Sequence, residues 1–132
     1  MKNLFLLPFN DYVLECTFLY GVYAENLEEA QKEFTEYLYE ENRNIFKNTK
    51  RVSTYEEIVF ILNHTILTIG EIEEIQNGQY NYFIPYVEKS SETPKIFKTN
   101  ADGDSHALRL YHGIGEVKDD YPAIYHIDEF LI

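Results

Sequence analysis

The sequence has one cysteine, few basic residues and no long apolar run, and each shortage excludes a class of protein. The lone cysteine, Cys16, excludes an internal disulfide. No stretch approaches the roughly 20 apolar residues that a membrane helix needs, so we expect no membrane partner. Lys and Arg number 11 against 23 Asp and Glu, which gives a net charge of −12. Direct binding to nucleic acid depends on basic residues, so this charge argues against it.

The sequence also lacks motifs for catalysis, for metals and for phosphate. It has no glycine-rich phosphate loop and no Cys/His spacing for zinc. The stretch 100–111 carries Asn, Asp and Asp at calcium-loop positions one, three and five, but Ser105 and Tyr111 stand where that loop needs Gly and Glu. The string at 103–105 matches part of a hydrolase signature without its strand and helix. We therefore expect no enzyme, no cofactor and no metal site.

The chain does contain enough apolar material for a folded core. Hydrophobic residues make up 45% of it, whereas a disordered chain of such charge would be much less hydrophobic. The length of 132 residues predicts a single domain over residues 1–132. The first apolar run is short and ends at Pro8, which predicts a strand and not a signal peptide. Together with the lone cysteine, this favours a cytoplasmic protein.

Capping patterns predict two helices. Asn26 followed by Glu29 forms a capping box for a long amphipathic helix over about 26–46. Glu41 falls in the apolar sector of this helix, so a bend or an end is expected near it. A second capping pattern at Ser53 to Glu56 predicts a short helix over about 54–63. The β-prone run at 58–62 leaves a strand as the alternative there.

The remaining apolar segments predict strands, and with the helices they predict an α+β fold with a mostly antiparallel sheet. Even positions of the second strand form an apolar face on which Cys16 is expected to be a packed thiol. Pro85 places its strand at an edge or its residue at a bulge. The predicted strands are residues 3–7, 11–23, 66–75, 80–87, 95–99, 105–112 and 123–131.

The first candidate partner-binding surface is an acidic stripe on the long helix. It consists of Glu25, Glu29, Glu33, Glu36 and Glu40, with Tyr39 beside it. A solvated helix face is the alternative. Like charges at i, i+4 cost roughly 0.2–0.5 kcal/mol per pair, and this tolerated cost favours a use for the stripe. Its acids are ~4.5–6 Å apart along the axis, against ~1.7 Å per charge in duplex DNA, so it could imitate at most a single strand.

The second candidate surface is the face of a predicted hairpin. Asn77-Gly78 is the preferred centre of a two-residue turn, and it would join the strands 66–75 and 80–87. In that register Glu71, Glu73, Tyr80 and Tyr82 share one face. Tyrosine is enriched where proteins bind partners, although a merely solubilising surface is the alternative.

These surfaces predict a small acidic binding protein that inhibits a basic protein, such as a nuclease or another nucleic-acid-handling enzyme. Inhibitors of the immunity, anti-restriction and phage anti-defence types work on this plan, which is an analogy of charge and size. A second hypothesis is a small-molecule-binding or hydrolytic domain that uses His126 and Asp128 with His106 or His112. A third is a structural subunit that buries its aromatic residues in a homo-oligomer.

Overall fold

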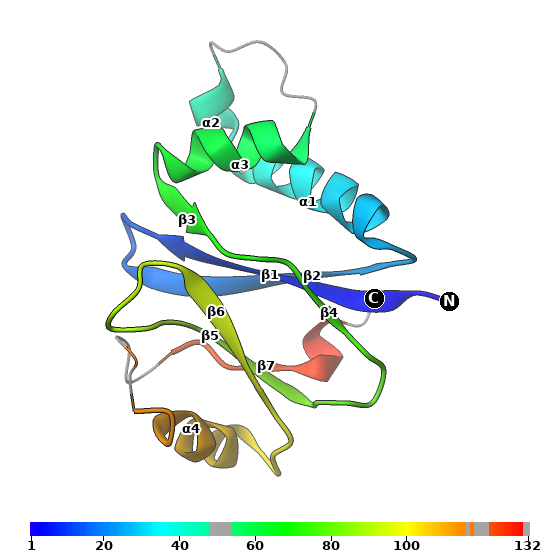
Figure 1. Ribbon diagram of the computed structural model, residues 1–132, viewed down its shortest axis with the longest axis vertical. Helices are drawn as coiled ribbons and strands as arrows, with labels where there is room; N and C mark the ends of the chain where they lie inside the picture. The colour runs from blue at the N-terminus through cyan, green and yellow to red at the C-terminus, as the bar shows by residue number, and fades with distance from the viewer. Residues whose placement is uncertain (48–53, 116, 118–121, 131–132) are drawn as a thin grey trace.

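The computed structural model describes residues 1–47, 54–115, 117 and 122–130 and confirms the predicted α+β fold. Four layers follow one another along the long axis of the molecule (Figure 1): a group of three helices, a first sheet, a second sheet and a single helix. Within the described ranges, no helix combines the length and the apolar character needed to span a membrane.

The first sheet has four antiparallel strands arranged around β1 (Asn3–Asp11). This strand pairs along its whole length with β2 (Cys16–Ala24), with Asn3 opposite Ala24 and Asp11 opposite Cys16. On its other side β1 pairs with β3 (Leu67–Ile69) near its end and with β4 (Glu73–Ile75) near its start. β1 is therefore the central strand, and β2 is an edge strand.

The second sheet has three antiparallel strands in the order β6, β5, β7. The ladder between β5 (Tyr82–Val87) and β6 (Pro94–Thr99) covers both strands. The short β7 (Tyr125–His126) pairs only with Tyr82 and Phe83 and continues into a 3₁₀ helix, η1 (Ile127–Phe130). Pro85 pairs with Ile96 of β6 but has no β7 residue opposite it, so β5 is locally an edge strand there, as a proline requires.

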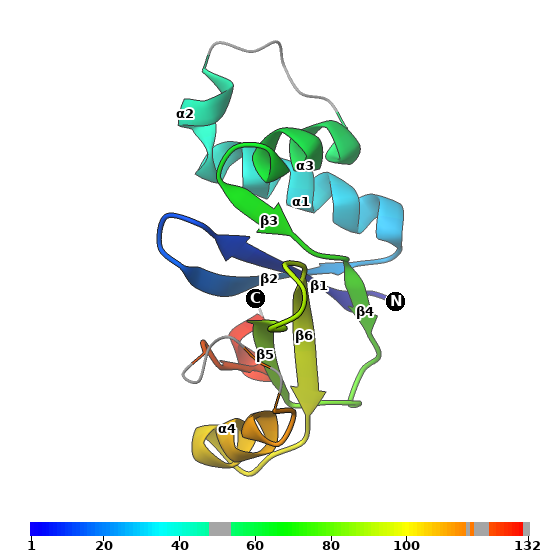
Figure 2. The same cartoon turned by 60° about the vertical axis from the view of Figure 1, so that its left-hand side comes forward.

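Three helices cover the outer face of the first sheet, and one covers the second sheet (Figure 2). Their bounds are α1 (Leu27–Glu41), α2 (Arg43–Phe46), α3 (Tyr55–Asn63) and α4 (Asp104–His112). The first capping prediction is confirmed, because Asn26 accepts a hydrogen bond from the Glu29 amide at 2.8 Å. The second predicted helix is present, but its cap is Thr54, which accepts a hydrogen bond from the Glu57 amide at 3.2 Å; the predicted cap, Ser53, lies outside the described residues. The predicted end near Glu41 is also confirmed: the long helix of 26–46 stops there, and α2 begins two residues later.

Apolar side chains fill all three spaces between the layers. Phe34 and Leu38 of α1 pack with Phe5 and Leu7 of β1 between the helices and the first sheet. Alternate residues of β1 face the second sheet, so the strand is buried on both sides. The space between the two sheets holds Leu4, Leu6, Leu19, Ile75, Phe83 and Ile96, and the space over α4 holds Tyr82, Ile84, Ala101, Ala107, Tyr111 and Val117.

The predicted course of the first two strands is wrong at their junction. The predicted break at 8–10 lies inside β1, and the turn falls at residues 12–15. The Asp11 carboxylate accepts hydrogen bonds from the Val13 and Leu14 amides at 2.8 and 3.1 Å, which fixes this turn. Cys16 is exposed beside the turn and is not a packed thiol. The alternation that includes Tyr12, Leu14 and Cys16 was misleading because these residues lie in or beside the turn and are exposed.

The predicted hairpin is also wrong, although its turn is present. A turn forms at Asn77-Gly78, because the Gln79 amide donates to the Gln76 carbonyl at 3.2 Å and Gly78 has a φ of 76°. Asn77 does not have the positive φ that the two-residue hairpin turn requires. However, β4 before the turn pairs with β1, whereas β5 after it pairs with β6. The turn therefore connects the two sheets. The long strand predicted at 66–75 is divided into β3 and β4 around Gly70, whose amide donates to the Pro8 carbonyl at 2.9 Å.

The segment predicted as a strand at 105–112 is helical, and the strand predicted at 123–131 is largely absent from its described residues, since residue 131 lies outside them. In α4 the buried residues Ala107 and Tyr111 are four apart, which is the helical spacing. Alternation of His106, Leu108 and Leu110 concealed this pattern. At the other segment only Tyr125 and His126 form a strand, before η1 begins at Ile127.

Candidate functional site

The acidic stripe lies on the outward side of α1. Glu33, Glu36 and Glu40 are exposed on the helix, and Glu25 is exposed just before it. Glu29 is half-buried. The buried residues of the helix are Ala30, Phe34 and Leu38, which pack toward the first sheet. The structure thus brings the stripe residues together on one side of the molecule.

Among the described residues, most of this charge forms no ion pair with a Lys or Arg side chain. α1 contains six glutamates and one lysine, Lys32, which leaves it with a net charge of −5. Glu40 pairs with Arg43 at 2.9 Å. Throughout the described part of the chain, Lys and Arg make no ion pair with Glu29, Glu33 or Glu36. The last turn of the helix carries acids and no base, although its macrodipole favours cations there.

Tyr39 does not add an exposed ring to the stripe. Its ring stacks on that of the buried Phe46 with centroids 5.3 Å apart, and the side chain is half-buried. This contact attaches α2 to α1. Tyr39 therefore has a packing role that the sequence did not reveal.

The four residues of the predicted hairpin face are separated. Tyr82 is buried under α4, where burial and the nearby Asp104 raise the pKa of its hydroxyl. Tyr80 is half-buried against the core between the two sheets. Glu73 pairs with Lys98 at 2.6 Å, and only Glu71 is fully exposed. No shared Glu/Tyr face exists on these four residues, because the two tyrosines belong to different cores.

Glu71 and Glu73 instead line a cavity of about 430 Å³ beside Pro8 and Pro94, where the two sheets meet. Tyr86 and Lys95 also line this cavity, and Lys95 pairs with Glu88 at 2.9 Å. Burial, followed by the charge of Glu88, raises the pKa of Tyr86, so its hydroxyl remains a neutral donor. The walls therefore carry both charges and neutral hydroxyls. Sequence reasoning missed this cavity because its walls come from four separate segments.

The histidines proposed for the second hypothesis make local structural contacts. His126 accepts the Asp128 amide at 3.1 Å through Nδ1, and that nitrogen lies 3.4 Å from an Asp128 carboxylate oxygen. The ring of His126 packs edge-on to Tyr82 with centroids 4.9 Å apart. These contacts close the short turn into η1. His112 is exposed at the end of α4.

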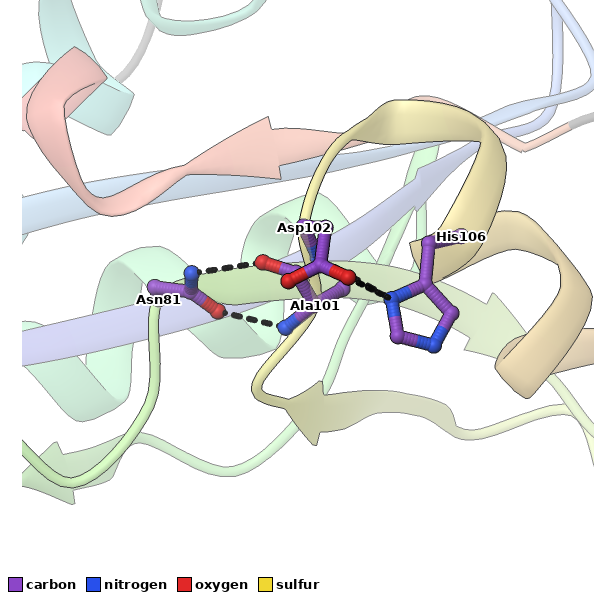
Figure 3. A network of polar contacts seen from close by, with 4 residues as sticks. All are labelled: Asn81, Ala101, Asp102 and His106. Carbon is purple, nitrogen blue, oxygen red and sulfur yellow. Dashed lines mark hydrogen bonds and ion pairs between the residues drawn. The ribbon is translucent and has the colours of Figure 1, made fainter.

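His106 belongs to a polar network at the start of α4 (Figure 3). Its Nδ1 accepts the Asp102 amide at 3.0 Å and lies 3.7 Å from the Asp102 carboxylate. Next to it, the Asn81 amide group forms two hydrogen bonds of 2.9 Å with the backbone of Ala101, one with the carbonyl and one with the amide. Both sets of bonds stabilise the path from β6 into α4. Sequence reasoning did not identify Asn81.

Among the described residues, no three His, Cys, Asp or Glu side chains gather in a way that could hold a metal ion. Comparison with known proteins found no match for the chain among protein-family models, curated proteins or solved structures.

Proposed function

We propose that this protein is a small acidic binding protein of the cytoplasm. It docks the exposed side of α1 on a basic protein and blocks that partner's nucleic-acid-binding surface. A nuclease or another nucleic-acid-handling enzyme is the expected class of partner. The observation that carries the proposal is the net charge of −5 on α1, most of which no basic side chain of the described chain neutralises.

This charge has a cost for the isolated protein. Two pairs of stripe residues, Glu29 with Glu33 and Glu36 with Glu40, repel at i, i+4 spacing by roughly 0.2–0.5 kcal/mol each. Acids in the last turn of a helix oppose the macrodipole by about 0.3–1 kcal/mol. The positive charges of a basic partner would attract these glutamates and offset the repulsion between them. The same field would accelerate association, and the acceleration would weaken with salt.

An exposed apolar turn on the same side of the molecule as the C-terminal end of α1 (Figures 1 and 2) supplies a second kind of contact. Tyr12, Val13 and Leu14 are 50%, 77% and 61% exposed in the turn between β1 and β2. Neighbouring acids Asp11 and Glu15 flank them. Apolar anchors surrounded by charge are typical of protein-binding surfaces, where the anchors slow dissociation. We therefore expect the turn to slow dissociation of the complex.

The proposal is tested by capture from the native cytosol on immobilised protein, with salt elution and mass spectrometry, followed by binding measurements with the purified partner. The test variant is Glu33→Lys with Glu36→Lys. The matched control is Glu74→Lys with Glu92→Lys, which changes the charge equally at exposed positions outside the helix. We expect the wild type and the control to retain a basic protein that nucleic acid displaces, and the test variant to lose it.

Equal capture by both double variants would refute a role for the stripe. Recovery of only acidic proteins or of further copies of this chain would refute the inhibitor proposal. Light scattering of the pure protein checks the latter outcome, because an oligomer that forms without a partner supports the structural-subunit alternative.

The cavity at Glu71 and Glu73 favours small-molecule binding as the second candidate function. Its volume of about 430 Å³ falls within the ~300–1,000 Å³ typical of ligand sites. Its opposite charges suit a polar, zwitterionic molecule. Thermal-shift screening against amino acids and similar zwitterions tests it, and a stabilisation that Glu71→Gln does not reduce would exclude this cavity as the site.

A further inference from the structure

A second cavity lies at the C-terminal end of α1 and has aromatic and acidic walls. Its volume is about 270 Å³, and the segments around it are the ends of α1 and β1, the start of β2, β3 and β7. Figures 1 and 2 both place the end of α1 and the turn between β1 and β2 on the same side of the molecule. We name this cavity the tyrosine–acid pocket. The lining residues used below are Phe9, Asp11, Phe18, Tyr37, Glu41 and Tyr125.

Aromatic rings form much of its wall. The rings of Phe9 and Phe18 are in contact, with centroids 5.7 Å apart. Tyr37 stacks on Tyr20 with centroids only 3.6 Å apart and ring planes 10° from parallel. The Tyr125 hydroxyl accepts the Leu19 amide at 3.3 Å, which fixes this ring at the edge of β2. Ring faces attract cations that lie within about 6 Å of the centroid.

The charges of the pocket are all negative. Asp11 and Glu41 contribute carboxylates, and the described residues that line the pocket include no Lys or Arg. One oxygen of Asp11 accepts the turn amides, which leaves its other oxygen without a bond to the described residues. The C-terminal end of α1 adds the negative pole of the helix dipole. The two carboxylates and the helix dipole therefore favour a cation at this position.

Burial and the nearby negative charges raise the pKa values of two tyrosines at this position. Burial, and then the charges of Glu41, Tyr20 and Tyr125, raises the pKa of Tyr37 to about 12. Burial, and then Glu33 and Glu41, raises the pKa of Tyr20. Both hydroxyls are therefore neutral at physiological pH and can accept a hydrogen bond from a cationic donor.

We propose that the tyrosine–acid pocket binds the guanidinium group of an arginine side chain of the partner protein. This inference rests on the proposed function, because a basic partner supplies the arginine. A guanidinium is planar, stacks on aromatic faces and bonds carboxylates through two parallel donors, whereas an ammonium does neither. The volume of about 270 Å³ is below that of ordinary small-molecule sites, which suits one side chain. Two carboxylates line the pocket, and the described residues contain no group of three His, Cys, Asp or Glu side chains that could hold a metal ion.

The test uses N-acetyl-arginine amide as a probe and N-acetyl-citrulline amide as its uncharged isostere. Backbone amide shifts of the labelled protein are followed by NMR during titration. We expect saturable shifts at Asp11, Tyr37 and Glu41 with the arginine compound only, with millimolar affinity. Glu41→Gln should weaken binding about tenfold, because a charge-assisted hydrogen bond is lost. Glu36→Gln is the matched control, since Glu36 is on the same helix but does not line the pocket, and it should bind as the wild type.

Equal shifts with both compounds, or unchanged affinity in Glu41→Gln, would overturn the pocket proposal. Loss of binding through misfolding is distinguished by the melting temperature, which Glu41→Gln should leave equal or higher because it removes a charge that opposes the helix dipole. The two proposals fail separately. If a purified basic partner binds through the stripe but the arginine probe does not bind, only the pocket is wrong. If the probe binds but no basic partner is captured, only the inhibitor function is wrong.

Discussion

Replacing Asn81 by alanine should destabilise the connection between β6 and α4. The Asn81 side chain makes two hydrogen bonds of 2.9 Å with the backbone of Ala101, and Ala101 is itself buried (Figure 3). Each bond contributes about 1 kcal/mol net, and the stranded amide and carbonyl of Ala101 add a desolvation cost of similar size. We therefore expect Asn81→Ala to lower the free energy of unfolding by about 2–3 kcal/mol.

The measurement is urea denaturation followed by far-ultraviolet circular dichroism. Asn100→Ala is the matched control, because the Asn100 amide makes a single exposed hydrogen bond, to the Gln79 carbonyl at 2.9 Å. Its loss should cost less than about 1 kcal/mol. Hydrogen exchange should also accelerate at the Ala101 amide in Asn81→Ala, since this amide loses its acceptor.

Asn81→Asp separates the two bonds. An aspartate still accepts the Ala101 amide but places a charged oxygen against the Ala101 carbonyl. The variant should therefore be unstable at neutral pH and should recover part of its stability in acid, where the carboxylic acid again donates. If Asn81→Ala lowers the free energy of unfolding no more than Asn100→Ala does, the two Asn81 hydrogen bonds do not stabilise the fold and the prediction is wrong.

Two further predictions concern packing and titration. Gly70→Ala should lower the free energy of unfolding by about 1–3 kcal/mol, because its Cβ would lie 2.3 Å from the Pro94 carbonyl oxygen. Gly103→Ser is the control: a Cβ there meets nothing within 4 Å, and serine is a better helix cap, so stability should be unchanged or higher. Equal losses of stability in the two variants would contradict the packing argument. Burial raises the pKa of both Tyr37 and Tyr55 to about 12, so the unfolded chain loses protons at pH 10–12 that the folded chain retains, and stability should fall through that window. Absorbance of tyrosinate measures it, and titration of every tyrosine near 10 in the folded protein would disprove it.

Helices were the part of the fold that the sequence predicted well, because their determinants are local. Asn26 caps the Glu29 amide as its capping box indicated, and the second helix forms as predicted, with Thr54 as its cap. The acidic stripe follows from the same periodicity, since the position of each glutamate around α1 depends only on its spacing. Residues 105–112 are the exception, because the weak helical pair Ala107 and Tyr111 competed with a clear alternation.

Strand partners were the part that could not be predicted. The turn at Asn77 and Gly78 is local and was found, but the partner of β4 is β1, about 70 residues earlier in the chain. Because β4 pairs with β1 and not with β5, the hairpin face that was predicted as the second candidate surface does not form. Both cavities were missed for the same reason, since each is enclosed by segments that only the packing of the layers brings together.

The end of α1 shows how a locally unfavourable residue contributes to a binding surface. Glu41 falls in the apolar sector of the helix, and the helix ends there, where the Asn42 amide group caps the Leu38 carbonyl at 2.8 Å. This ending places the Glu41 carboxylate at the negative pole of the helix and beside Tyr37 in the pocket. A residue selected only for stability would not be an acid at this position. Glu41→Gln should therefore raise the stability of the protein and weaken its binding of cations. A glutamate that only faced solvent would not affect cation binding.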